Sequence, residues 1–212
     1  MSDRSSTEAL IRQLAAAPAP VAFRPAVALS ATVVLVGFVL VLFLQVFGLR
    51  ADLVGAWAAL PAQAKTLLPL ALSVLAGWLA LRMSRPEGQG ALWPLAIPAG
   101  LALAMVLQRL TVAEGPLLVE LVGQTAMACL VSISVLSALP LAAGVILLRR
   151  GATTRPRVTG ALLGLAVASA MTAGYALHCP EDSPLFFVTW YGLGILIVTG
   201  IGAALGHRFL RW

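Results

Sequence analysis

Six long apolar stretches, almost free of ionisable side chains, constrain this chain more than any other feature. A helix rises 1.5 Å per residue and the hydrocarbon core of a bilayer is about 30 Å thick, so about 20 apolar residues are needed to cross it. The clearest stretch, residues 26–48, has this length and contains no ionisable residue. The others are residues 67–81, which extend back to residue 63 if Lys65 reaches the interface, and residues 92–107, 121–148, 158–177 and 185–205.

The composition agrees with a membrane protein. Of the 212 residues, 60% are hydrophobic and 10% are charged, and the mean hydropathy is +0.98. Charged residues make up about 25% of an ordinary soluble domain. We therefore predict an all-α, polytopic integral membrane protein with six transmembrane helices. It has a leader of residues 1–25, a transmembrane domain of residues 26–206 and a tail of residues 207–212.

The basic residues are distributed unequally between the two sides of the predicted membrane domain. Eleven arginines flank one side, whereas only Arg50, Lys65 and Arg109 flank the other. Because positive residues concentrate in cytoplasmic segments, both termini are predicted to lie in the cytoplasm. The net charge of +6 is then explained by the arginines that flank the cytoplasmic ends of the predicted spans. Direct nucleic-acid binding is not predicted, because the arginines are divided among four segments and form no single stripe.

The stretches themselves argue against transport and catalysis. No Asp, Glu, Lys, Arg or His lies in the predicted hydrocarbon region away from its boundaries, although proton and ion pathways usually need such groups there. Phosphate-loop, zinc-protease, nucleophile-elbow and haem motifs are also absent from the sequence. The chain is therefore predicted to be non-enzymatic and to need no cofactor. The glycine pairs Gly160/Gly164 and Gly202/Gly206 predict close packing of helices within one chain.

The leader contains one short amphipathic segment. The run of residues 5–8, Ser-Ser-Thr-Glu, has the spacing of a capping box and predicts a helix start, and two prolines after residue 17 predict its end. Leu10, Ile11 and Leu14 form a small apolar stripe on this helix. Two interpretations remain: an anchor that lies on the lipid bilayer, or a helix that docks in the groove of a cytosolic partner.

The segment after residue 177 contains the most reactive chemistry. Pro180 and Pro184 restrict its backbone, which keeps its side chains close together at the predicted outer face. These side chains are an imidazole, a thiol and two carboxylates: His178, Cys179, Glu181 and Asp182.

The second cysteine lies in the fourth stretch. Cys129 follows Glu120 by nine residues, which on a continuous helix places it about 13 Å deeper. A disulfide with Cys179 therefore requires the outer segment to dip inward, since Cα atoms more than about 7 Å apart cannot be bridged. Two interpretations stay open: a thiol pair that is oxidised or that binds a soft metal with His178 as a further ligand, or plain burial of two small side chains.

Several segments resemble a known family. They are GYALHCPEDSPLF at residues 174–186, WYGLG at 190–194, LRRGA at 148–152 followed by Arg155-Pro156, LIRQLA at 10–15, and Cys129. Together they resemble the NrsF-like family of membrane anti-sigma factors over nearly the whole chain. The resemblance implies a negative regulator that holds an extracytoplasmic-function sigma factor of the SigF type at the inner membrane. Heavy metals or oxidants would release that sigma factor.

The resemblance also implies roles for particular residues. Cys129 and Cys179 become the signal-sensing pair, with His178, Glu181 and Asp182 beside them, and Cys129, Cys179 and His178 become a transient metal site. Leu10, Ile11 and Leu14 become the sigma-factor-binding stripe. The alternative is a membrane thiol oxidoreductase or a metal-binding membrane protein without a sigma partner, although the chain lacks a CxxC motif.

Overall fold

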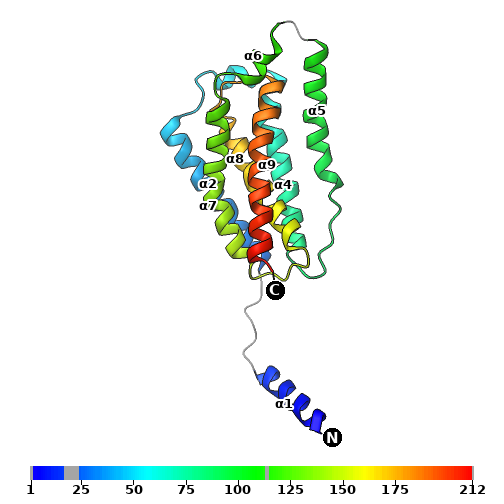
Figure 1. Ribbon diagram of the computed structural model, residues 1–212. Coiled ribbons are helices and arrows are strands. Elements are labelled where there is room, and N and C mark those ends of the chain that lie inside the picture. The colour runs from blue at the N-terminus through cyan, green and yellow to red at the C-terminus, as the bar shows by residue number, and fades with distance from the viewer. Residues whose placement is uncertain (1, 17–23, 113–114, 212) are drawn as a thin grey trace.

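The computed structural model describes residues 2–16, 24–112 and 115–211, and this part of the chain contains helices and no strand. Six helical spans are long and apolar enough to cross a membrane, which confirms the predicted fold class. Figure 1 shows them as a bundle of roughly parallel and antiparallel rods. The elements are α1 (Ser2–Ala16), α2 (Pro25–Phe47), α3 (Leu53–Ala56), α4 (Leu60–Met83), η1 (Trp93–Leu95), α5 (Ala96–Thr111), α6 (Leu117–Val122), α7 (Ala126–Leu148), α8 (Pro156–Tyr175) and α9 (Pro184–Phe209).

Prolines mark the beginnings of four of the spanning helices. Proline occupies one of the first two positions of α2, α4, α8 and α9, where the first backbone N–H groups have no acceptor within the helix. The fourth predicted stretch differs from the prediction, because it is not one helix. It divides into α6 and α7 at Gly123, whose φ of +56° is accessible mainly to glycine.

The two glycine pairs bring α8 and α9 together at the centre of the bundle. A Cβ added to Gly160 would overlap the Gly202 carbonyl oxygen and lie 2.7 Å from the Gly206 Cα. A Cβ added to Gly164 would lie 2.6 Å from the Val198 carbonyl oxygen. These distances leave no room for a side chain, so the predicted close packing within one chain is confirmed.

One end of the bundle collects most of the arginines. The connections after α4 and α7, the end of α9 and the start of α2 all lie there, and Figure 1 places α1 beyond the same end. The opposite end holds α3, α6 and the segment between α8 and α9. The arginines at this end are Arg24, Arg82, Arg85, Arg149, Arg150, Arg155, Arg157, Arg208 and Arg211. We call it the arginine-rich end; its position in the cytoplasm remains a prediction.

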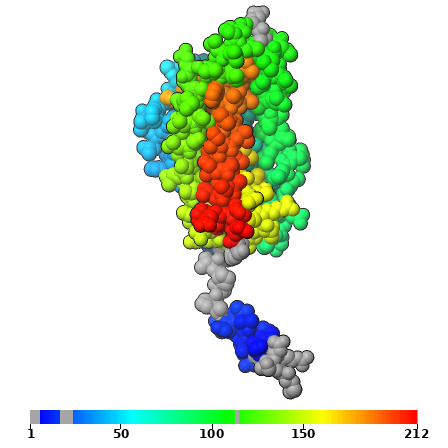
Figure 2. Space-filling model, in the orientation of Figure 1, coloured from blue at the N-terminus to red at the C-terminus, as the bar shows by residue number. Residues whose placement is uncertain are grey.

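The leader helix α1 begins earlier than predicted, at Ser2, so residues 5–8 lie inside the helix. Its predicted end at Pro18 and Pro20 lies outside the described residues. The apolar stripe is open to solvent, since Leu10, Ile11 and Leu14 are 54%, 59% and 67% exposed. Figure 2 shows the side chains of α1 outside the surface of the bundle.

Candidate functional site

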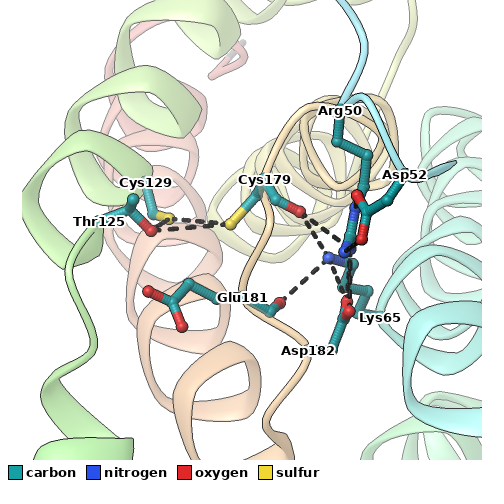
Figure 3. Close-up of polar contacts among 8 residues, drawn as sticks. All are labelled: Arg50, Asp52, Lys65, Thr125, Cys129, Cys179, Glu181 and Asp182. Carbon is teal, nitrogen blue, oxygen red and sulfur yellow. Dashed lines mark hydrogen bonds and ion pairs between the residues drawn. The ribbon is translucent and has the colours of Figure 1, made fainter. Parts of the chain in front are cut away.

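The two cysteines meet at the end of the bundle opposite the arginines. The Cys129 Sγ lies 3.8 Å from the Cys179 Sγ, and neither residue is exposed. The Thr125 hydroxyl lies 3.7 Å from the first sulfur and 3.8 Å from the second (Figure 3). A disulfide bond is about 2.05 Å long, so these are free thiols held at close range.

A break between α6 and α7 separates Glu120 from Cys129. Counting along a continuous helix placed Cys129 about 13 Å beyond Glu120. That count does not apply here, because α6 ends at Val122 and α7 begins only at Ala126. Cys129 therefore lies in the first turn of α7, close to the loop that carries Cys179.

A buried lysine holds that loop in place. The Lys65 ammonium donates hydrogen bonds to the carbonyl oxygens of Cys179 at 2.7 Å and Glu181 at 3.0 Å. It also pairs with the Asp182 carboxylate at 2.7 Å (Figure 3). Lys65 was expected to reach the membrane interface, but its side chain is 2% exposed and all three of its donors are used within the protein.

Arg50 is the second cation that binds the loop. Its guanidinium donates to both Asp182 carboxylate oxygens, at 2.8 and 3.0 Å, and to Asp52 at 2.7 Å. Its backbone N–H donates to the Leu177 carbonyl oxygen at 3.1 Å. Burial alone would raise the pKa of Asp182, but the hydrogen bonds from Arg50 and Lys65 outweigh it, so the pKa lies below its ordinary value. The carboxylate therefore remains ionised between the two cations.

His178 and Glu181 lie beside the thiols in sequence but have other partners. The His178 Nδ1 lies 2.9 Å from the Gly48 carbonyl oxygen, and its ring packs edge-on against Phe43 at 5.4 Å. Glu181 accepts a hydrogen bond from the Gln124 backbone N–H at 2.9 Å. Within residues 2–16, 24–112 and 115–211, no three His, Cys, Asp or Glu side chains gather in a way that could hold a metal ion. The predicted set of Cys129, Cys179 and His178 is thus not assembled in this conformation.

The surroundings of the thiols are aromatic and buried. Tyr175, Phe186 and Tyr191 are 3%, 0% and 2% exposed and belong to the same buried cluster as both cysteines. The Tyr191 hydroxyl is buried as well. A reagent can therefore reach the thiols only after local opening of the loop.

Sequence reasoning found both cysteines and Asp182 but missed the residues that position them. Arg50, Lys65 and Thr125 are 54 to 129 residues from Cys179 along the chain. One signal was present: Arg50 and Lys65 are among the few cations on the side that also carries the acidic 181–182 segment. Opposite charges on the same side of a membrane domain are candidates for pairing.

These features define a class: a six-helix membrane protein with a buried dithiol at one end and an exposed leader helix at the other. Its residues 14–212 match the family described as NrsF, negative regulator of sigma F, and the chain belongs to that family. The predicted resemblance is therefore confirmed. Leu14 is the first residue of the matched region, and Leu10 and Ile11 precede it.

Two relatives are named as anti-sigma-F factors. The anti-sigma-F factor NrsF of Caulobacter vibrioides is 36% identical over 143 residues, which cover 65% of this chain and 67% of that protein. The probable anti-sigma-F factor NrsF of Azospira oryzae is 39% identical over 90 residues, or 42% of each chain. No solved structure matches the chain.

Proposed function

We propose that this protein is an anti-sigma factor that holds an extracytoplasmic-function sigma factor of the SigF type at the inner membrane and releases it when its two thiols react. The observation that carries the proposal is the 3.8 Å separation of the Cys129 and Cys179 sulfurs in a family of negative regulators of sigma F. Its role is regulatory and involves no enzymatic turnover.

The first step is closure of the thiol pair. To form a disulfide, the two sulfurs must approach each other by about 1.8 Å. The two thiols lose two protons and two electrons to a two-electron oxidant, such as a peroxide or a hypohalous acid. Chromate could also act by oxidation, whereas a soft cation such as cadmium would replace the two protons and bind both thiolates. Either change pulls the loop at Cys179 toward α7.

The second step is transmission to the other end of the bundle. The loop is attached to α4 through Lys65 and to the α2–α3 connection through Arg50. It also joins α8 to α9, whose glycines hold those helices in backbone contact. Tightly packed helices move as units, so displacement of the loop shifts α4 and α7 against α8 and α9. This shift alters the arginine-rich end.

The third step is release of the partner. The exposed stripe of Leu10, Ile11 and Leu14 provides an apolar surface spaced for a groove on the sigma factor. An ion pair between Glu8 and Arg12, at 3.7 Å one turn apart, supports the helix that presents this stripe. A short helix is marginal alone in water and gains order on binding, so its affinity responds to small changes at its anchor.

A pull-down tests the proposal. Tagged full-length protein is purified in mild detergent from untreated cells and from cells treated with cadmium or hypochlorite, and co-purifying proteins are identified. We expect a sigma factor at rest and its loss on treatment. Cys129→Ser and Cys179→Ser should each keep the sigma factor bound under treatment, whereas Ser132→Ala on the same helix α7 should release it as the wild type does.

The outcomes separate the alternatives. Normal release by both single cysteine variants would refute thiol sensing while leaving the anti-sigma role intact. Absence of a sigma factor in every condition would refute the anti-sigma role and favour a membrane thiol oxidoreductase or a metal-binding protein. An oxidoreductase would then change the redox state of other membrane proteins when it is deleted.

A further inference from the structure

A groove opens at the arginine-rich end between two helices that are distant in sequence. It lies between the beginning of α2 and the end of α4 and has a volume of about 450 Å³. Its walls are apolar toward the middle of the helices, and two guanidinium groups lie at its rim. The lining residues are Pro25, Ala26, Leu29, Trp78, Leu81, Arg82 and Arg85.

The rim is positive and lacks a negative partner. The Arg82 guanidinium lies over the Trp78 ring, 5.2 Å from its centroid. Among residues 2–16, 24–112 and 115–211, no carboxylate forms an ion pair with Arg82 or Arg85. α2 also begins at this point with no acidic residue in its first turn and no side-chain cap, which adds the positive end of its dipole. The two exposed guanidinium groups are therefore available to bind an anion.

The walls identify the remainder of the ligand. Leu29 and Trp78 are 45% and 53% exposed, although both belong to helices that span the membrane. Their exposed surface therefore faces hydrocarbon, and the groove is continuous with the bilayer. A tryptophan beside an arginine is typical of the level of lipid headgroups. Positive charge at the rim with apolar walls beneath complements a phosphate that carries acyl chains, and not a soluble anion.

We propose that this groove binds one anionic phospholipid from the leaflet at the arginine-rich end. The headgroup phosphate lies between Arg82 and Arg85, because guanidinium groups bind phosphate oxygens in pairs. One acyl chain lies along Leu29, Trp78 and Leu81. The site is independent of the thiol pair, and it lies where the leader joins the first spanning helix.

Native mass spectrometry measures this binding directly. Full-length protein in an uncharged detergent is titrated with phosphatidylglycerol and with phosphatidylcholine of the same acyl chains. Each basic residue near an anionic lipid surface contributes about a fivefold factor, so we expect the wild type to bind the first phosphatidylglycerol at least tenfold more tightly. The double variant Arg82→Gln/Arg85→Gln should lose that preference and keep its affinity for phosphatidylcholine.

The chain offers a matched control pair at the same end. Arg149 and Arg150 are a second pair of arginines close in sequence, and the Arg149 guanidinium lies 5.8 Å from the Phe209 ring centroid, but neither residue lines the groove. Arg149→Gln/Arg150→Gln should retain the preference. Equal losses in the two double variants would show a general effect of surface charge and overturn the proposal, as would a wild type without preference.

Two further measurements keep the test decisive. Leu29→Trp fills the apolar wall and leaves both arginines in place, so it should weaken the first phosphatidylglycerol at least tenfold even if the arginine variants fold poorly. Unchanged affinity in Leu29→Trp would overturn the acyl-chain part of the proposal. Soluble glycerol phosphate, added as a competitor at the lipid concentration, should not displace the lipid. Displacement would assign the site to a soluble phosphate compound and overturn the lipid assignment.

Discussion

Neutralising Asp182 should open the loop that covers the thiols. In Asp182→Asn, Lys65 keeps its two carbonyl acceptors but loses its counter-ion while remaining 2% exposed. Removing one partner of a buried ion pair costs about 3–5 kcal/mol. The cost here is smaller, about 2–3 kcal/mol, because asparagine still offers an oxygen to the ammonium and the Asp182 side chain is 34% exposed, so water screens part of the charge.

This free energy acts mainly on local opening of the loop. A destabilisation of about 2–3 kcal/mol multiplies the population of an open state by about 30–150. Cys129 and Cys179 are fully buried, so a maleimide reacts with them only in that open state. When reclosing is faster than labelling, the labelling rate of the detergent-purified protein should rise by the same factor, which gel-shift labelling over time measures.

Asp52→Asn is the matched control. Asp52 also binds the Arg50 guanidinium, at 2.7 Å, but its side chain is 67% exposed and it contacts no buried ammonium. Its neutralisation should leave the labelling rate almost unchanged, because water screens the exposed Asp52 carboxylate and Arg50 keeps its bonds to Asp182. The reasoning fails if Asp182→Asn labels at the wild-type rate, or if the two variants accelerate labelling equally.

Three further predictions follow from the same contacts. The pKa of Asp182 is lowered in the folded protein, so its ionised form stabilises the fold above the ordinary carboxyl pKa of about 3.9. This contribution is lost as the pH falls below about 4. Thermal unfolding should therefore show a smaller acid destabilisation in Asp182→Asn than in the wild type. Gly160→Leu should lower the free energy of unfolding by about 3 kcal/mol in a mixed-micelle titration, because the new side chain would meet the α9 backbone. Gly200→Leu should leave it unchanged, because a Cβ there has nothing within 4 Å. Equal effects of the two substitutions would contradict the close-contact argument. In a pull-down, Ile11→Asp should weaken capture of the sigma factor at least tenfold, whereas Gln13→Asp should not. Equal capture by the two variants would show that the apolar stripe is not part of the interface.

The membrane fold follows from the order of residues alone. Whether a segment spans a bilayer depends on the summed transfer free energy of about 20 consecutive residues, a local property that periodicity and composition report. The six spans were therefore predictable, with ends displaced by a few residues from those of α2 to α9. The glycine pairs were predictable for a similar reason, since a helix places residues four apart on one face.

The break at Gly123 was harder to predict. Glycine is common in membrane helices, and nothing local distinguishes Gly123 from Gly144, which lies within the uninterrupted helix α7. A Cβ at residue 123 would lie 2.5 Å from the Phe186 ring, so the turn depends on how α9 packs against it. Because the break was missed, Cys129 was placed by counting along a continuous helix that does not exist.

The sequence by itself determined the membrane class, the unequal distribution of arginines and, through its family likeness, the candidate thiols. Only the tertiary structure decided that Cys129 and Cys179 lie 3.8 Å apart and that His178 faces other partners. It also decided that Lys65 is buried beneath the loop. The physical reason is the separation along the sequence over which each property is determined. Hydropathy is summed over neighbouring residues. A contact between residues 50 or 114 positions apart depends on how the intervening helices pack and how their loops are anchored.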